Sequence, residues 1–257
     1  MNIIGIIPAR MDSSRFPGKP LASICGVPMI VHVYLRSKMC KILDEVYVAT
    51  CDQKIADCIN SIGGKVVMTK DTHERASDRC AEAMLKIEKE TDWRVDIIVM
   101  IQGDEPMTFP EMIDEALNPI ITNEAVIVTN LMAPLKTKEE FEDPNEVKVV
   151  VDRFNNALYF SREPIPSRKK GAKSIPMLKQ VCIIPFRRDF LIQYNTMEST
   201  PLEIIESVDM MRILEHGLKV KMVPTKFETK SVDTPKDLEL VEKLMKNDKL
   251  MPVYNKK

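Results

Sequence analysis

Residues 2–21 read NIIGIIPARMDSSRFPGKPL, an apolar run followed at once by a loop rich in cations and small residues. The apolar part ends at Pro8 and has the length of a single buried strand. The loop then gathers three cations with small residues, namely Arg10, Arg15 and Lys19 with Ser13, Ser14 and Gly18. This order predicts a first strand that carries a cationic loop at its carboxyl end.

Further apolar runs follow, and helical patterns separate them. The runs are EVYVAT at 45–50, KVVMT at 65–69 and DIIVMIQ at 96–102. Apolar residues recur at spacings of three and four over 28–41, 52–62, 77–90 and 109–118. Strands that alternate with helices predict an α/β fold built on a largely parallel sheet.

The second half of the chain is less regular. Strands are expected at 125–131, 147–152, 157–161 and 180–186, some of them antiparallel, and again at 218–224. Residues 201–216 predict one amphipathic helix closed by Gly217, and a last helix is expected to start near Thr234 and Pro235. We therefore expect one domain over 1–257, with a mixed, mostly parallel sheet flanked by helices and a small dimerisation or lid region at about 125–195. The basic run 167–173 (SRKKGAK) is the candidate for a mobile loop, as a substrate lid or as an ordinary solvated segment.

Composition limits the classes of function. The 37 Lys and Arg residues nearly balance the 38 Asp and Glu residues, which argues against nucleic acid or an anionic membrane as a partner. The sequence contains neither a signal-peptide pattern nor an apolar run of membrane-spanning length, so a cytoplasmic location is expected. The six scattered cysteines lack a CxxC pair and are expected to be small packed thiols.

The cationic loop is the strongest candidate site. Small residues let backbone N–H groups approach phosphate oxygens, and fixed cations offset the charge on a leaving pyrophosphate. The spacing differs from that of a Walker P-loop. A phosphate site is favoured over a merely solvated basic loop.

Two acidic motifs follow predicted elements. IQGDEPM at 101–107 places Asp104 and Glu105 beyond a buried strand, where carboxylates suit Mg²⁺, although a polar turn that caps the next helix explains them equally well. SVDTPKDLE at 231–239 places Asp233 before Thr234, which is able to cap the last helix, so this motif taken alone is structural.

Taken together, the motifs resemble the 3-deoxy-manno-octulosonate cytidylyltransferases, also called CMP-KDO synthetases. The resemblance covers nearly the whole chain in the family order, through IIPARMDSSRFPGKPL, PMIVHV, VYVATCD, HERASDRCAE, IQGDEP, DPNEVKVVVD, YFSREPIP, PLEIIESVDMMRILEHG and SVDTPKDLE. It implies a Rossmann-like nucleotidyltransferase fold and a homodimer. It also implies a reaction in which the anomeric hydroxyl of an acidic sugar attacks the α-phosphorus of CTP and expels pyrophosphate, for lipopolysaccharide or other surface polysaccharide synthesis.

The resemblance also implies roles for individual residues. The triphosphate would be held by Arg10, Ser13, Arg15 and Lys19. Mg²⁺ would be bound by Asp104 and Asp233, and catalysis would rest on Arg10, Lys19 and Asp104. The nucleotide would be bordered by Ser77, Asp78 and Arg79. The sugar would be contacted by Gln102, Arg162 and Gln180, with the guanidinium of Arg162 suited to the sugar carboxylate.

The chain departs from the family pattern near the acceptor. Many members have a histidine where this chain has Gln180, and Ala76 and Ser77 stand where Gly and Thr are common. An amino-KDO, another ulosonic acid or a phosphonate thus remains an alternative acceptor, and a non-catalytic nucleotide-binding protein is the alternative from another class. His73 is expected to be a surface or capping residue, and His32, His216, Met210 and Met211 are expected to be structural.

Overall fold

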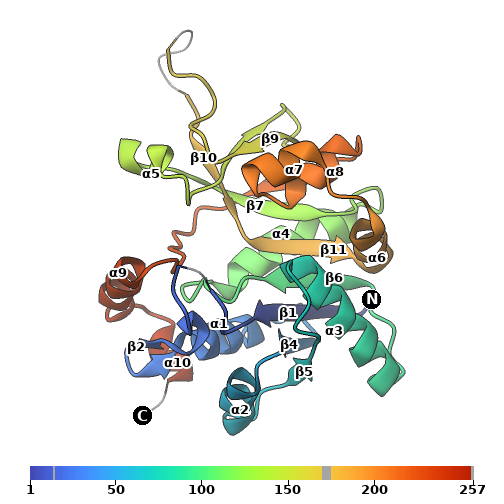
Figure 1. Ribbon diagram of the computed structural model, residues 1–257, viewed down its shortest axis with the longest axis vertical. Coiled ribbons are helices and arrows are strands. Elements are labelled where there is room, and N and C mark those ends of the chain that lie inside the picture. The colour runs from blue at the N-terminus through green and yellow to red at the C-terminus, as the bar shows by residue number, and fades with distance from the viewer. Residues whose placement is uncertain (14, 170–174, 256–257) are drawn as a thin grey trace. The chain divides into compact units, whose positions relative to one another are not determined.

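The computed structural model describes residues 1–13, 15–169 and 175–255, and these form two compact units. Unit 1 comprises 1–114 and 229–257, and unit 2 comprises 115–228, so the chain leaves unit 1 within helix α4 (Pro110–Thr122) and returns to it after β12 (Lys221–Pro224). Figure 1 labels most of the elements of both. Ser14 of the cationic loop lies outside the described residues, and so do residues 170–173 of the predicted mobile run at 167–173.

Unit 1 contains a parallel sheet whose strands lie in the order β6 (Ile97–Ile101), β1 (Ile3–Ala9), β4 (Glu45–Thr50) and β5 (Val66–Met68). Strands β1, β4 and β6 are almost wholly buried, as expected for parallel strands covered on both faces, whereas the edge strand β5 exposes Met68. The connecting helices are α1 (Met29–Lys38), α2 (Gln53–Ser61) and α3 (Ala76–Thr91). The predicted α/β fold with a parallel sheet is therefore confirmed, and each of these elements lies within three residues of its predicted bounds.

The strand order places a topological switch point between β1 and β6. The chain runs outward from β1 to β4 and β5, and then returns to β6 on the other side of β1. In open α/β sheets, ligands bind beyond the carboxyl ends of the strands at such a point. The cationic loop follows β1 and the 102–107 turn follows β6, so both candidate motifs lie at this edge.

The end of the chain packs back onto unit 1. Helix α9 (Pro235–Met245) contributes to an apolar cluster with β2 (Ser23–Ile24) and α1, whose buried members are Ile24, Met29, Val232, Val241 and Met245. Short elements that the sequence did not predict complete the unit, namely the 3-10 turn Lys19–Leu21, β2, β3 (Val27–Pro28) and α10 (Met251–Tyr254). His32 is structural as predicted: its ring is buried and contacts Tyr254 Oη and the Ile24 carbonyl, each at 2.8 Å.

Unit 2 contains a mixed sheet in the order β12, β7 (Thr129–Pro134), β10 (Leu178–Val181), β8 (Lys148–Val151) and β9 (Ala157–Ser161). The pairs among β7, β10, β8 and β9 are antiparallel, and β12 pairs with β7 in parallel. The antiparallel strands expected in this half are therefore confirmed. The helices are α5 (Lys138–Glu142), α6 (Arg188–Thr196), α7 (Pro201–Glu206) and α8 (Met210–Glu215).

Two elements of unit 2 were wrongly predicted to be continuous, and each is divided in two. The single helix expected at 201–216 is two helices, because Ser207 adopts a left-handed φ of 51° that ends α7. The single strand expected at 180–186 is divided at Cys182 into β10 and β11 (Ile183–Arg187). Met210 and Met211 are buried core residues as predicted, each 1% exposed. In the described part of the chain, no helix combines the length and apolarity needed to cross a membrane.

Candidate active site

The cationic loop is folded by contacts of its own backbone. Gly18 has a left-handed φ of 75°, and its N–H donates to the Met11 carbonyl at 2.9 Å, which closes the loop. The Met11 N–H in turn donates to Asp52 Oδ2 at 2.8 Å and fixes the start of the loop beside β4. Directly after Gly18, a 3-10 turn begins at Lys19, so the Lys19 side chain leaves the loop from a defined position.

The turn after β6 comes close to the end of β1. A Cβ on Gly103 would lie 3.1 Å from the Pro8 carbonyl oxygen and 3.2 Å from Ile30 Cδ1, so the approach requires glycine or a local shift. Asp104 follows immediately, and its carbonyl accepts the Val232 N–H at 2.9 Å. This hydrogen bond joins the IQGDEP turn to the SVDTPKD segment, two motifs far apart in the sequence.

Asp233 is held by the cap of α9. Thr234 is the N-cap residue and forms a capping box with Asp237, whose carboxylate also accepts the Asp233 N–H at 3.2 Å. The predicted capping role of Thr234 is confirmed. Because the neighbouring Val232 is fully buried in the apolar cluster, the position of Asp233 is fixed from both sides.

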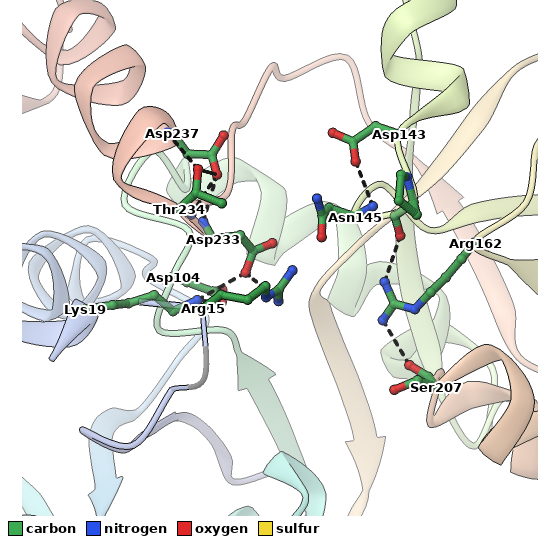
Figure 2. Close-up of polar contacts among 11 residues, drawn as sticks. Arg15, Lys19, Asp104, Asp143, Asn145, Arg162, Ser207, Asp233, Thr234 and Asp237 are labelled. Atoms are coloured by element: carbon green, nitrogen blue, oxygen red, sulfur yellow. Dashed lines mark hydrogen bonds and ion pairs between the residues drawn. The ribbon is translucent and has the colours of Figure 1, made fainter. Parts of the chain in front are cut away.

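Lys19 lies between the two carboxylates of the predicted metal site. Its Nζ donates to Asp104 Oδ2 at 2.8 Å and to Asp233 Oδ1 at 3.3 Å, and Arg15 Nη2 donates to the same Asp233 oxygen at 2.9 Å (Figure 2). Burial alone would lower the pKa of the Lys19 ammonium, but Asp104 and then Asp233 outweigh it and raise the pKa above its ordinary value. Lys19 is therefore a permanent cation at this site.

These residues line a cavity of about 310 Å³ in unit 1. The predicted site residues on its wall are Arg10, Ser13, Arg15, Lys19, Arg79, Gln102 and Asp104. Asp233 adjoins this set through its contacts with Arg15 and Lys19. Ser77 and Asp78 belong to the first turn of α3 but do not line the cavity.

The cavity is also lined by residues that the sequence analysis did not place in the site. His73, Glu74, Arg75 and Ala76 line it where the chain enters α3. His73 Nε2 contacts Glu82 Oε2, and the same carboxylate oxygen accepts the Lys70 N–H at 3.0 Å. His73 is thus a half-buried wall residue hydrogen-bonded to Glu82, whereas a surface or capping residue was expected. The nine-residue separation of His73 and Glu82 is the only signal in the sequence, and it is too common to predict such a pair.

The two predicted sugar residues of unit 2 have well-defined partners inside that unit. Arg162 donates through Nε to the Glu206 carbonyl at 2.8 Å. Its Nη1 donates to the Pro144 carbonyl at 2.8 Å and its Nη2 to the Ser207 carbonyl at 3.1 Å (Figure 2). A guanidinium carries two N–H groups on each terminal nitrogen, and these contacts use one on each. Gln180 lies on β10 and donates to Asn130 Oδ1 at 2.6 Å.

The described residues contain no cluster of three or more His, Cys, Asp or Glu side chains that could hold a metal by itself. Asp104 and Asp233 nevertheless converge on one cation, the Lys19 ammonium. Two carboxylates that share a cation are a donor set that fits Mg²⁺, which takes one or two carboxylates and completes its shell with water and substrate phosphates.

Comparisons with known proteins show which proteins this chain is similar to. The family model described as "Cytidylyltransferase" matches residues 4–223. A 3-deoxy-manno-octulosonate cytidylyltransferase of Geobacter metallireducens is 43% identical over 95% of this chain and 98% of its own, and one of Acaryochloris marina is 41% identical over 93% and 95%. The solved structure of a CMP:2-keto-3-deoxy-manno-octonic acid synthetase complexed with CTP is similar with a TM-score of 0.88, at 38% identity over 96% of this chain and 99% of that one. A cytidylyltransferase from Leptospira borgpetersenii, at 18% identity and a TM-score of 0.64, shares the fold.

Proposed function

The chain belongs to the 3-deoxy-manno-octulosonate cytidylyltransferase family, and we propose that it transfers CMP from CTP to the anomeric hydroxyl of 3-deoxy-D-manno-octulosonate (KDO) and releases pyrophosphate. The product would serve lipopolysaccharide synthesis. One observation supports this most directly: Lys19, Asp104 and Asp233 meet beside a cavity lined by the cationic loop, at the switch point of a parallel sheet.

The chain's own residues would bind and orient the triphosphate. Arg10, Ser13 and Arg15 line the cavity and would hold phosphate oxygens. Lys19 has three N–H donors, two of which are directed to carboxylates, so the third is available to a phosphate. Because Arg15 and Lys19 are already held by carboxylates before the substrate arrives, they would stabilise the charge that grows on the leaving pyrophosphate with little reorganisation.

Mg²⁺ is the metal that we propose for this site, held by Asp104 and Asp233. When bound, it would neutralise charge on the phosphate oxygens of the nucleotide. The carboxylates would also keep Lys19 and Arg15 oriented toward the triphosphate, since both cations already contact them.

Gln102, Arg162 and Gln180 are the residues that we propose to contact the acceptor. Gln102 lines the cavity of unit 1, and in unit 2 the two remaining N–H groups of Arg162 would bind the sugar carboxylate. The reaction needs no nucleophilic side chain, because the sugar hydroxyl attacks the α-phosphorus directly and the protein aligns the two. Ser77 and Asp78 are proposed to border the nucleotide from the first turn of α3.

Pyrophosphate release tests this function. Each of CTP, UTP, ATP and GTP is incubated with the protein and Mg²⁺, with and without KDO. Release that requires both CTP and KDO is the expected result. Repeating the assay with EDTA, and then with added Mg²⁺, tests the metal, because activity that persists in EDTA would remove the metal from the mechanism.

A second acceptor is favoured by one observation, the position of Gln180. Where many family members have a histidine, this chain has an amide, and Gln180 Nε2 is engaged with Asn130. Amino-KDO, another ulosonic acid and a phosphonate are therefore included as acceptors. Turnover with one of these and none with KDO would keep the transferase and replace its acceptor, whereas CTP binding without release from any acceptor would indicate a non-catalytic protein.

We also propose that the protein is a homodimer in the cytoplasm, where CTP is available. Unit 2 exposes aliphatic side chains on β9 and α7, with Leu158 61%, Ile204 68% and Ile205 73% exposed, and Glu206 hydrogen bonds join these two elements. Two of these side chains lie outside the 125–195 region expected to form the interface. Light scattering at working concentration measures the mass, and a mass of one chain would contradict the dimer.

A further inference from the structure

A network of buried polar side chains joins the end of the chain to α1 in unit 1. Arg36 on α1 is fully buried, and its Nη2 donates to Asp248 Oδ1 at 2.5 Å. Its Nε donates to Tyr254 Oη at 3.0 Å, and its guanidinium lies 5.4 Å from the centre of the Tyr254 ring. Neither Arg36 nor these two partners line the cavity, so the proposed binding of CTP and sugar leaves this network without a role.

The network allows one arrangement of donors and acceptors. Burial lowers the pKa of the His32 ring below its ordinary value, so the ring is neutral at pH 7. Its Nε2 faces the Ile24 carbonyl at 2.8 Å, and a carbonyl only accepts, so Nε2 carries the proton. Nδ1 then accepts from Tyr254 Oη at 2.8 Å, while the same oxygen accepts from Arg36 Nε. Because each of these donors has one acceptor, Arg36 is held in a single position.

Arg36 also contacts the turn that carries Asp104. Its Nη1 donates to the Thr108 carbonyl at 3.4 Å. Thr108 is fully buried, and its N–H and hydroxyl both donate to the Glu105 carbonyl, at 3.1 and 2.9 Å. The 102–108 turn is therefore closed on itself directly after Asp104, and Arg36 holds its far end.

The last part of the chain holds this turn at a second point. The Asp104 carbonyl accepts the Val232 N–H, as described above, and α9 then leads to Asp248. A buried ion pair contributes little net stability compared with apolar residues of similar volume, because both charges lose their water. The side chains of Arg36 and Asp248 are 0% and 4% exposed, so the position that their pairing fixes explains it better than stability does.

We propose that Arg36 is a positioning residue of the active site: anchored by Asp248 and Tyr254, it fixes the 102–108 turn and thereby the place of the Asp104 carboxylate. The proposal rests on the proposed cytidylyltransferase function, in which Asp104 binds the metal. Small displacements of a site residue cost a large part of the rate. The end of the chain thus influences how tightly the metal is bound, although it does not line the cavity.

Hydrogen exchange tests the structural step in the protein without metal or nucleotide. The double variant Arg36→Met with Asp248→Leu removes both charges, so that neither is left buried and unpaired. The Thr108 amide, which closes the turn, is expected to exchange roughly 10-fold faster, because the turn loses a hydrogen-bonded anchor. The Val48 amide on β4, which is hydrogen-bonded outside the turn, is expected not to change. Equal acceleration at both amides, or none at Thr108, would overturn the proposal.

The Mg²⁺ requirement tests the functional step. In the double variant, the Mg²⁺ concentration for half-maximal pyrophosphate release is expected to rise roughly 10-fold, because Asp104 is no longer held beside Asp233. The matched control is Lys38→Met with Glu45→Leu, which removes an ion pair between α1 and β4 that does not line the cavity. It is expected to leave the Mg²⁺ requirement unchanged. An unchanged requirement in the folded Arg36 variant, or the same rise in the control, would contradict the role.

Tyr254→Phe keeps the proposal testable if the double variant does not fold. It removes the hydroxyl that Arg36 and His32 share and keeps the ring. The exchange rate of the Thr108 amide and the Mg²⁺ requirement are both expected to rise by a smaller factor, roughly threefold. No change in either quantity would show that this anchor does not act on the turn, against the proposal.

These measurements fail separately from the proposed function. If no acceptor yields pyrophosphate, the transferase is wrong, but hydrogen exchange still shows whether Arg36 holds the turn. If pyrophosphate release requires CTP and KDO while the Mg²⁺ requirement of the folded variants does not change, the transferase stands and the positioning role of Arg36 is wrong.

Discussion

Around the cavity of unit 1, Lys19 contacts two carboxylates and Arg79 has a terminal nitrogen without a partner among the described residues, whereas two cations of unit 2, Arg187 and Lys148, are bound by backbone carbonyls. Arg187 in unit 2 donates to the carbonyls of Val126, Ile120 and Asn123 at 2.9, 2.7 and 3.1 Å. Lys148 is fully buried and donates to two further carbonyls, those of Asp143 and Arg162. The cations that line the cavity of unit 1 thus have capacity for a ligand, whereas Arg187 and Lys148 hold the fold of unit 2.

The difference has a physical cause. A buried cation must have its donors satisfied, and a fold does this with carbonyls or carboxylates at fixed positions. A binding site leaves some donors for the substrate, at a cost in stability that the surrounding packing must offset. The comparison therefore predicts that substitutions of site residues in unit 1 change activity more than stability, and that those of structural residues in unit 2 do the reverse.

The largest effect is expected from Asp104→Ala. The side chain supplies one of two proposed metal ligands and the shorter contact to Lys19, and its removal should lower kcat/KM roughly 1000-fold, or about 4 kcal/mol. The thermal midpoint should change little, because the backbone carbonyl of residue 104 still accepts the Val232 N–H. Pyrophosphate release and a thermal melt measure the two quantities.

Asp57→Ala on the surface of α2 is the matched control for this substitution, since it removes a carboxylate of unit 1 that does not line the cavity. It should leave kcat/KM unchanged. Near-normal activity in Asp104→Ala would remove Asp104 from the mechanism and weaken the contrast between the units.

The next largest effect is expected in unit 2, from Arg212→Met. Arg212 is 1% exposed and forms a bidentate pair with Glu203, at 2.8 Å from Nε and 2.7 Å from Nη2. Its loss leaves a buried carboxylate unpaired, and the free energy of unfolding should fall by about 3 kcal/mol, measured in urea. The kcat/KM of the folded protein should be nearly unchanged.

The double variant Arg212→Met with Glu203→Leu sharpens this test. Because it removes the unpaired charge, it should be more stable than Arg212→Met alone. If it is less stable, the penalty comes from packing or from the capping box of α7, in which Glu203 also takes part.

The sequence predicted unit 1 better than unit 2. In unit 1 the parallel strands are short, continuous apolar runs with Gly or Pro nearby, so their existence and order could be derived; 45–50 was placed without error. In unit 2 the break at Ser207 depends on a left-handed φ at a residue type that rarely adopts it, and apolar spacing continues across the break. Helix α6, which carries Phe190 and Tyr194 into an aromatic cluster, was missed altogether.

The site was predictable only in part. Strand ends place Lys19 and Asp104 at one edge of the sheet by topology alone. Asp233 reaches them through the Val232 N–H to Asp104 carbonyl bond and the burial of Val232, which are tertiary contacts that spacing does not display. From the residues alone, the SVDTPKDLE motif was interpreted as a helix cap. The structure confirms that cap at Thr234, the residue after Asp233.

A smaller effect is expected from Arg162→Lys. Arg162 is the cation of unit 2 that we propose to bind the sugar carboxylate, in contrast to the structural cations of that unit. Lysine keeps the charge but cannot present two parallel N–H groups to a carboxylate, so the KM for the sugar should rise roughly 10-fold while the KM for CTP is unchanged. Arg187→Lys is the control, since its carbonyl partners make it structural: it should lower the thermal midpoint without changing either KM. A lower midpoint with no change in KM for Arg162→Lys would assign Arg162 to the structural cations of its unit.

The smallest effect is expected from Glu82→Gln, which tests how firmly the cavity wall is held. Burial alone would raise the pKa of the Glu82 carboxyl, but hydrogen bonds from Lys86, the Lys70 N–H and His73 lower it to about 2. A carboxyl with a lowered pKa stabilises the fold above its ordinary pKa of about 4.5, and this stabilisation is lost as the pH falls toward 2. Because Lys86 is partly exposed, we expect Glu82→Gln to cost only about 1 kcal/mol at neutral pH.

The pH dependence of the thermal midpoint measures this contribution. The wild-type protein should lose more stability than Glu82→Gln between pH 4.5 and 2, so the difference between them should shrink as the pH falls, whereas Glu90→Gln, an exposed position on the same helix, should follow the wild type throughout. A constant difference across this range would mean that the Glu82 charge does not hold His73. In that case the wall that carries Arg79 would depend on the packing of α3 rather than on this ion pair, and the contrast between the units would rest on Lys19, Asp104 and Arg79.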